Sequence, residues 1–161
     1  MSAQPLKTAD PLPPGLPQEL LASTVFLLAR LGATVKLETM NECEAAGFSA
    51  YDYAVLALLG ESARETQGAI ADALRIDRSQ LVGLLDGLEE RGLVERRRDP
   101  IDRRRHVVSL TPAGKRQLAR FRSIVKRIEE EFLAPLDAES RSTLHDLLLR
   151  VASHRDARFG H

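Results

Sequence analysis

Apolar side chains recur every three or four residues along most of the chain, a spacing typical of α-helices. The first run predicts a helix from Gln18 to about Glu44, with an apolar face too wide for one partner to cover. A second helix is expected from Ser49 to Leu59, with the serine as N-cap and Gly60 as the stop signal. The chain therefore opens with two helices, the first of which needs more than one neighbour.

A short pair of helices follows. Thr66 caps the first, and the turn at Arg75–Asp77 leads into the second, which runs to Arg91. In the second helix Asp77 is a good N-cap, and Gln80 at the third position is able to reach back to it. Leucines spaced i, i+3, i+4 and i+7 give this helix one buried stripe: Leu81, Leu84, Leu85 and Leu88. Two short helices with a tight turn, the second with a free face, indicate a helix-turn-helix.

After Gly92 the apolar period changes from 3.6 to 2, which predicts two short strands at 93–96 and 106–110. Asp99–Asp102 lies between them as a turn containing Pro100. Six arginines, at 96–98 and 103–105, surround this turn. The hairpin is therefore expected to be a basic wing beside the helix-turn-helix.

Two more helices are expected after the wing. Thr111 and Pro112 start the first, which carries a seam with 3-4-3-4 spacing: Leu118, Phe121, Val125, Ile128 and Phe132. Asp137 opens the second, whose apolar positions are Leu144, Leu147, Leu148 and Val151. Because both ends of the chain carry apolar helical faces outside the compact centre, we expect them to be buried against each other and against a second copy.

The predicted fold class is mainly α with a small β-hairpin wing: a winged helix-turn-helix domain with N- and C-terminal dimerisation helices. Prolines at 5, 11, 13 and 14 make residues 1–16 an extended or disordered arm. The remaining boundaries are an N-terminal dimerisation helix at 17–47, a DNA-binding lobe at 48–110, C-terminal dimerisation helices at 111–155 and a flexible tail at 156–161. Within the lobe, the recognition helix spans about 77–91 and the wing about 93–110.

Composition narrows the class of protein. With 161 residues, 43% of them hydrophobic, the chain is long enough for one globular domain without disulfides or metals. The single cysteine, Cys43, excludes an internal disulfide, and the four histidines are not spaced as metal ligands, so no metal or cofactor is expected. No apolar run approaches the roughly 20 residues that span a bilayer, and no leader pattern is seen. A cytoplasmic protein is expected, without a membrane partner.

Charge is balanced overall but unevenly placed. The chain has 23 basic and 23 acidic residues, yet residues 17–62 sum to −4 and residues 91–127 to +10. A concentrated basic stripe in a neutral protein indicates a local contact with a polyanion. The chain has only seven aromatic residues and no tryptophan, so it offers few side chains that could stack on the bases of single-stranded nucleic acid.

Two segments of the sequence resemble the MarR family of transcription regulators. One is the wing and following helix start, Asp99–Arg105 with Val107–Gly114, and the other is Leu84–Val94. The resemblance implies a homodimer shaped like a triangle, with a winged helix at each lower corner, that binds a pseudo-palindromic operator in double-stranded DNA. It also implies a repressor that releases DNA when a small effector, often phenolic or aromatic, or an oxidant acts. Cys43 does not match the position of the family's peroxide sensors, and a buried or inert thiol is the preferred interpretation.

The expected DNA-binding residues lie on the recognition helix and the wing: Arg78, Ser79, Gln80, Val82, Gly83, Asp86, Arg97, Arg98, Asp102, Arg103, Arg104 and Arg105. The resemblance makes Arg104 a minor-groove finger, with Asp102 orienting it, and strand alternation would place Arg104 opposite its two neighbours. Gln80 is either a base contact or only a cap. Where many relatives carry Thr-Arg and then Arg, this chain has Val82-Gly83 and Gly87. These glycines either allow a close backbone approach to DNA or to a neighbouring element, or are neutral surface changes.

Five residues fall where the family's effector pocket would lie: Phe26, Met40, Phe48, Tyr51 and Tyr53. Most of them are also compatible with an ordinary core. Two alternative functions are a protein-interaction module and an enzyme. A winged helix can serve as a protein-interaction module without specific DNA readout, but such a module has no need of the arginines around the wing turn. An enzyme is not expected, because no phosphate loop, Ser-His-Asp arrangement or HExxH helix is present.

Overall fold

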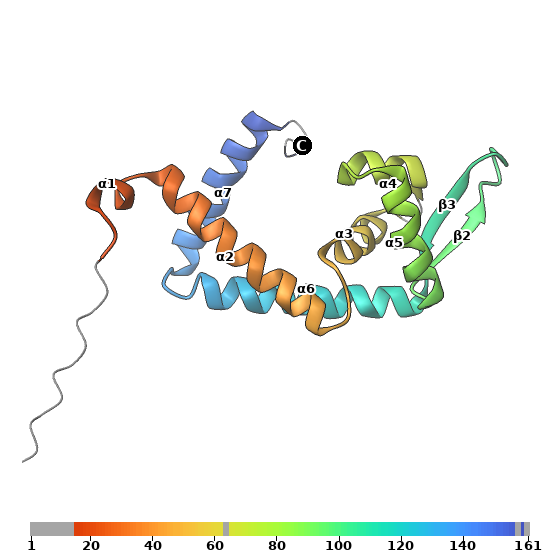
Figure 1. Cartoon of the computed structure of the whole chain (residues 1–161), viewed down its shortest axis with the longest axis horizontal. Coiled ribbons are helices and arrows are strands. Elements are labelled where there is room, and N and C mark those ends of the chain that lie inside the picture. The colour runs from red at the N-terminus through yellow and green to blue at the C-terminus, as the bar shows by residue number, and fades with distance from the viewer. Residues whose placement is uncertain (1–14, 63–64, 157–158, 160–161) are drawn as a thin grey trace, which may run out of the picture. The chain divides into compact units, whose positions relative to one another are not determined.

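The computed structural model describes residues 15–62, 65–156 and 159, so most of the predicted arm and tail lie outside the described residues. It is mainly helical with one small sheet, as predicted (Figure 1). In chain order the described elements are α1 (Gln18–Leu21), α2 (Thr24–Ala45), α3 (Ala50–Glu61), β1 (Glu65–Thr66), α4 (Gln67–Leu74), α5 (Arg78–Glu90), β2 (Val94–Arg98), β3 (His106–Leu110), α6 (Pro112–Phe132) and α7 (Ala138–Arg155).

The chain forms two compact units that divide within α2, between Thr34 and Val35. In the first unit, the single helix predicted from Gln18 is wrong. The backbone N–H of Phe26 donates to the hydroxyl of Ser23 at 3.2 Å, so this serine ends the short α1 turn and starts α2 as a new helix. A hydroxyl residue inside an apolar run therefore outweighed the helical spacing around it.

The core of the second unit is built by α3, α4, α5, α6 and the sheet. Leu81, Leu85 and Leu88 of α5 are buried in it, as their spacing predicts, while Leu84 is half-buried. The largest fully buried side chain is Phe121 of α6. This packing fixes one face of α5 and leaves its other face to solvent.

Helix α3 begins as predicted but ends later. Ser49 and Asp52 form a capping box, in which each side chain accepts the backbone N–H of the other residue. The helix then continues through Gly60, which was expected to stop it. A Cβ at Gly60 would lie 2.4 Å from the Leu118 side chain of α6, so the glycine serves close helix packing rather than termination.

The sheet is antiparallel with strand order β1-β3-β2. In the predicted hairpin Val94 pairs with Leu110 and Arg98 with His106, and the ribbon extends away from the helices as a wing (Figure 1). Strand β1, only two residues long, was not predicted. Residues 103–105 form a turn rather than strand, so the alternation expected for these arginines does not hold.

Most of the apolar seam of α6 is buried against other residues of the same chain. Leu118, Phe121 and Ile128 are buried within the second unit, so the expectation that this seam faces a second copy is wrong for these three residues. The exposed apolar side chains of this unit lie elsewhere. Helix α7 has no buried residue and presents Leu147, Leu148, Leu149 and Val151, each between 41% and 56% exposed.

Candidate nucleic-acid interface

The start of α5 is held by Asp77. Its carboxylate accepts the backbone N–H groups of Ser79 at 2.6 Å and Gln80 at 3.3 Å, and the Ser79 hydroxyl also donates to it. These bonds, first the one from the Ser79 hydroxyl, lower the pKa of Asp77. The Gln80 side chain is exposed and makes no described bond to the cap, which leaves its amide available to a partner.

The free face of α5 carries the residues that the sequence predicts for it. Arg78, Ser79, Gln80, Val82 and Gly83 are all exposed. A Cβ added at Gly83 would meet no atom within 4 Å, and the same holds at Gly87. Neither glycine is therefore required by packing within the described residues.

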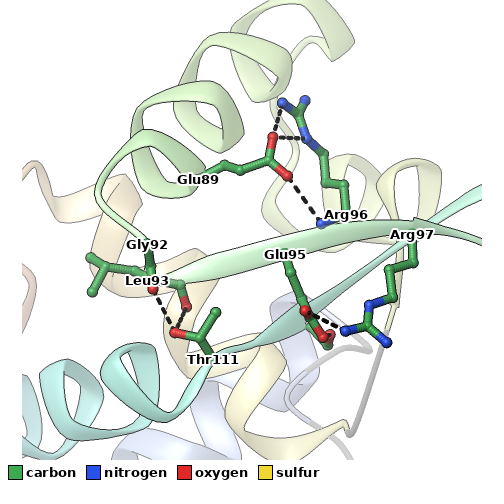
Figure 2. A network of polar contacts seen from close by, with 8 residues as sticks. Glu89, Gly92, Leu93, Glu95, Arg96, Arg97 and Thr111 are labelled. Carbon is green, nitrogen blue, oxygen red and sulfur yellow. Dashed lines mark hydrogen bonds and ion pairs between the residues drawn. The ribbon is translucent and has the colours of Figure 1, made fainter.

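Asp86 is engaged differently from the prediction. Its carboxylate lies 2.6 Å from the guanidinium of Arg96 on β2, so this candidate DNA residue already has a cationic partner. The same guanidinium contacts Glu89 at 2.5 Å, and the backbone N–H of Arg96 donates to the other oxygen of Glu89 at 3.2 Å (Figure 2). Hydrogen bonding to Arg96 lowers the pKa of Glu89, and bonding to Glu89 and Asp86 raises the pKa of Arg96. The sequence does not distinguish Arg96 from the arginines of the wing tip, so this link is not predicted from it.

The arginines of the wing tip fall into two groups, those with an acidic partner and those without a described one. Arg97 pairs with Glu95 at 2.9 Å and Arg105 with Asp102 at 3.2 Å. The other three arginines are exposed and make no described ion pair: Arg98, Arg103 and Arg104. Uncompensated charge therefore gathers on both sides of the turn.

Asp102 does not orient the guanidinium of Arg104 in this structure. Its carboxylate accepts the backbone N–H of Arg104 at 3.1 Å and pairs with the side chain of Arg105 instead. The backbone N–H of Arg105 also donates to the Asp102 carbonyl at 2.9 Å. Asp102 thus shapes the turn from which Arg104 projects.

A groove of about 500 Å³ joins the two predicted DNA elements. Its lining comes from the starts of α4 and α5 and from the wing: Thr66, Gln67, Gly68, Arg78, Leu81, Val82, Arg104, Arg105 and His106. It brings together four predicted residues, Arg78, Val82, Arg104 and Arg105. Sequence reasoning missed Gln67, Gly68 and His106. The Thr66 cap was the available signal for the first two, because it marks the start of α4.

The base of the wing is tied to the start of α6. The Thr111 hydroxyl lies 2.6 Å from the carbonyl oxygen of Gly92 and 3.2 Å from that of Leu93 (Figure 2). The backbone N–H of Thr111 also donates to the Leu93 carbonyl at 3.1 Å. One turn later, Gly114 lies so close to Leu93, the residue before β2, that a Cβ would be 2.0 Å from the Leu93 carbonyl oxygen. The wing and α6 are therefore in direct backbone contact.

The effector candidates are only partly brought together. Phe48 is buried edge-on against Phe121, with ring centres 4.9 Å apart, and Tyr53 lies 5.4 Å from the same ring. Met40 and Tyr51 are exposed. Phe26 belongs to the first unit and is half-buried there.

Other reactive groups are few in the part of the chain that the structure describes. Cys43 is buried in the last turn of α2, and burial, followed by the charges of Asp52 and Glu42, raises the pKa of its thiol. Across residues 15–62, 65–156 and 159, no three His, Cys, Asp or Glu side chains gather as a metal site. None of the described helices is both long and apolar enough to cross a membrane.

Comparison with known proteins gives consistent matches. The model of the MarR family matches residues 48–106. The putative transcriptional regulatory protein for the hcr operon of Thauera aromatica is 38% identical over 99 residues, 62% of this chain and 60% of that protein. The match therefore spans about three fifths of that relative's length.

Solved structures agree over more of the chain. A MarR family transcriptional regulator from Rhodococcus sp. RHA1 is 32% identical, with a TM-score of 0.68 over 80% of this chain and 91% of that one. CouR from Rhodococcus jostii RHA1, bound to p-coumaroyl-CoA, is 32% identical, with a TM-score of 0.69 over 84% of this chain and 96% of that one. With this identity and coverage the chain is a transcriptional regulator rather than an enzyme, and it belongs to the MarR family.

Proposed function

We propose that this protein is a homodimeric repressor that binds a pseudo-palindromic operator in double-stranded DNA. The observation that carries the proposal is the groove between α5 and the wing, lined by Arg78, Arg104 and Arg105. A recognition helix suits the major groove and a basic ribbon tip the minor groove, where A·T-rich sequence concentrates negative potential. The phosphate backbone between the two grooves would then lie along this basic groove. A regulator that acts on such an operator works in the cytoplasm.

In this proposal the residues divide by task. Arg78, Ser79, Gln80, Val82 and Gly83 face the major groove, Arg104 enters the minor groove, and the other arginines of the tip contact phosphates. Arg97, Arg98, Arg103 and Arg105 make up this last set. Asp102 supports the tip by holding the turn, and Asp86 acts through Arg96 rather than on bases.

Selection from a pool of random duplexes tests DNA recognition. We expect the pure protein to enrich one sequence with two inverted half-sites about 10 base pairs apart, with affinity that falls steeply as salt rises. If no sequence is enriched and binding to duplex DNA is absent at low salt, the protein is better described as a protein-interaction module built on a winged helix.

The dimer is supported by the exposed apolar side chains of α7, together with Leu37 and Met40 of α2, which are 60% and 36% exposed. Apolar surface of this extent calls for a partner, and a second copy is the simplest one. Light scattering at micromolar concentration should give twice the chain mass. A monomer bound one to a half-site would contradict the proposal.

We also propose release of DNA by a small phenolic or aromatic effector. Support comes from CouR, whose solved structure holds p-coumaroyl-CoA, and from the aromatic cluster of Phe48, Tyr53 and Phe121 in this chain. Phe26, Met40 and Tyr51 remain proposed members of the site. Titrating aromatic acids and their thioesters into an operator complex should reveal compounds that displace DNA. Compounds that bind tightly without changing DNA affinity would argue against the proposal.

A further inference from the structure

Arg96 occupies a different place from the other arginines of the wing. Its side chain is 22% exposed, against 74% for Arg97, the next residue along β2. Because successive strand residues point to opposite faces, Arg97 turns toward Glu95 while Arg96 turns toward α5. Arg96 is therefore committed to the protein rather than to a nucleic acid.

Both carboxylates that Arg96 contacts lie on one side of α5. Asp86 and Glu89 are three residues apart, so they are neighbours on the helix surface. The guanidinium lies 2.6 Å from the first and 2.5 Å from the second, and its Nε donates to Glu89 at 2.9 Å. Two carboxylates and a planar fork with fixed donor directions define an orientation as well as a distance.

The position of this link along the wing gives it a geometric consequence. Thr111 already fixes the base of the wing at Gly92 and Leu93. Arg96 is attached three residues further out, roughly 10 Å along an extended strand. One attachment point would let the ribbon pivot, whereas two points along the same strand fix its direction relative to α5.

We propose that Arg96, with Asp86 and Glu89, is a positioning group that sets the angle between the recognition helix and the wing and thereby determines sequence discrimination. The inference rests on the proposed function, since it assumes that α5 and the wing occupy adjacent grooves of one duplex. A wing held at one angle inserts Arg104 at one register relative to the bases under α5. A wing free to pivot still contacts phosphates on any sequence, because that attraction has no register.

The test compares Arg96→Lys with Arg97→Lys. Both variants keep the charge and lose the guanidinium fork, and they differ only in the face of β2 that is altered. Fluorescence anisotropy would measure the dissociation constants for the operator selected by the unaltered protein and for a random duplex of equal length. The discrimination ratio is the dissociation constant for the random duplex divided by that for the operator. We expect Arg96→Lys to reduce this ratio about tenfold or more, with an unchanged salt slope on random DNA, and Arg97→Lys to change the ratio less than twofold.

A second pair of variants tests the carboxylate side. Asp86→Asn removes a negative charge and one partner of Arg96, whereas Glu95→Gln removes a negative charge of the wing without touching that link. Loss of charge alone should tighten binding to every duplex in both variants. We expect only Asp86→Asn to lower the ratio as well. Thermal unfolding of each variant accompanies the measurement, and if Arg96→Lys does not fold, Asp86→Asn decides the question.

Two outcomes would overturn the inference. Unaltered discrimination in Arg96→Lys or Asp86→Asn would show that the link does not set the register. An equal loss of affinity for all duplexes in Arg96→Lys and Arg97→Lys would make Arg96 one more phosphate contact. Either result leaves the proposed function intact provided that the unaltered protein discriminates its operator, whereas a protein that discriminates nothing would overturn both.

Discussion

The guanidinium of Arg91 lies 3.4 Å above the centre of the Phe48 ring. The same side chain donates to the carbonyl of Gly47 at 2.8 Å. These contacts join the end of the recognition helix to the turn before α3, where Gly47 has a positive φ of 77°. The end of α5 is therefore anchored beside the aromatic cluster that we propose for effector binding.

Replacing Arg91 by alanine should lower the free energy of unfolding by about 1–2 kcal/mol, because a cation–π contact and a hydrogen bond from a charged donor are lost together. Urea unfolding followed by circular dichroism would measure it. Arg120→Ala is the matched control, since Arg120 is exposed on α6 and has no described partner. Equal stability of the two variants would show that the Phe48 contact contributes nothing.

Gly83→Ala and Gly87→Ala should each raise the free energy of unfolding by about 0.5–1 kcal/mol, because alanine favours helix and the new Cβ meets open space. If the backbone of α5 approaches DNA closely, the same changes should weaken operator binding. Thermal unfolding and anisotropy on the same samples would separate the two effects. Unchanged operator affinity in both variants would mark these glycines as neutral surface positions.

Gly114→Ala provides the opposite case. Its Cβ would collide with the Leu93 carbonyl oxygen, which is backbone and cannot rotate away. We expect this variant to be destabilised, in contrast to the two recognition-helix glycines, and the same unfolding assay would detect it. A stable Gly114→Ala protein would mean that the wing base moves apart readily.

At the wing tip, Arg104→Ala should weaken operator binding by about 1–3 kcal/mol and relax the preference for A·T pairs. Arg103→Ala, which removes an exposed arginine of the same turn, should weaken all duplexes alike and lower the salt slope by up to about 0.9. Asp102→Ala should act as a milder form of Arg104→Ala, because the turn that holds the Arg104 backbone is lost. Tighter operator binding by Asp102→Ala would show instead that the tip acts as a diffuse positive patch.

The Asp77 cap predicts an acid-sensitive stability. Since the pKa of Asp77 is lower in the folded chain than its ordinary value near 3.9, the ionised cap stabilises the fold above that value. This contribution should disappear as the pH falls through the folded pKa. Asp77→Asn keeps an acceptor oxygen but cannot titrate, so the difference in melting temperature between the two proteins should shrink below about pH 4. A difference independent of pH would show that the charge of Asp77 is irrelevant to the cap.

Local signals accounted for the elements that form the DNA-binding lobe. The leucine stripe of α5, the caps at Asp77 and Thr111 and the two-residue period of the wing are all read from neighbours in the sequence. The structure confirms the caps, the paired strands and three of the four leucines, with Leu84 only half-buried. These features depend on backbone geometry within a few residues, which the sequence specifies directly.

The failures share a different origin. The sequence predicts a helix end at Gly60 and does not reveal that this glycine packs against Leu118, a residue nearly sixty positions away. The apolar spacing of α6 correctly indicated a buried face, but not that α3 and β3 of the same chain would pack against this helix. Likewise, the charge pattern indicated a basic wing without distinguishing Arg96, whose partners are set by tertiary structure.

The backbone contact at Gly114 bears on the construction of chimeric regulators. Exchanging the wing is a natural way to alter DNA preference, and the hairpin looks like a self-contained insert. Yet its inner end abuts α6 with no room for a methyl group between Leu93 and Gly114. A transplanted wing will seat correctly only if it brings the first turn of its own α6, or if the recipient has glycine there. The exchangeable cassette in this protein is therefore larger than the ribbon and includes the beginning of the long helix.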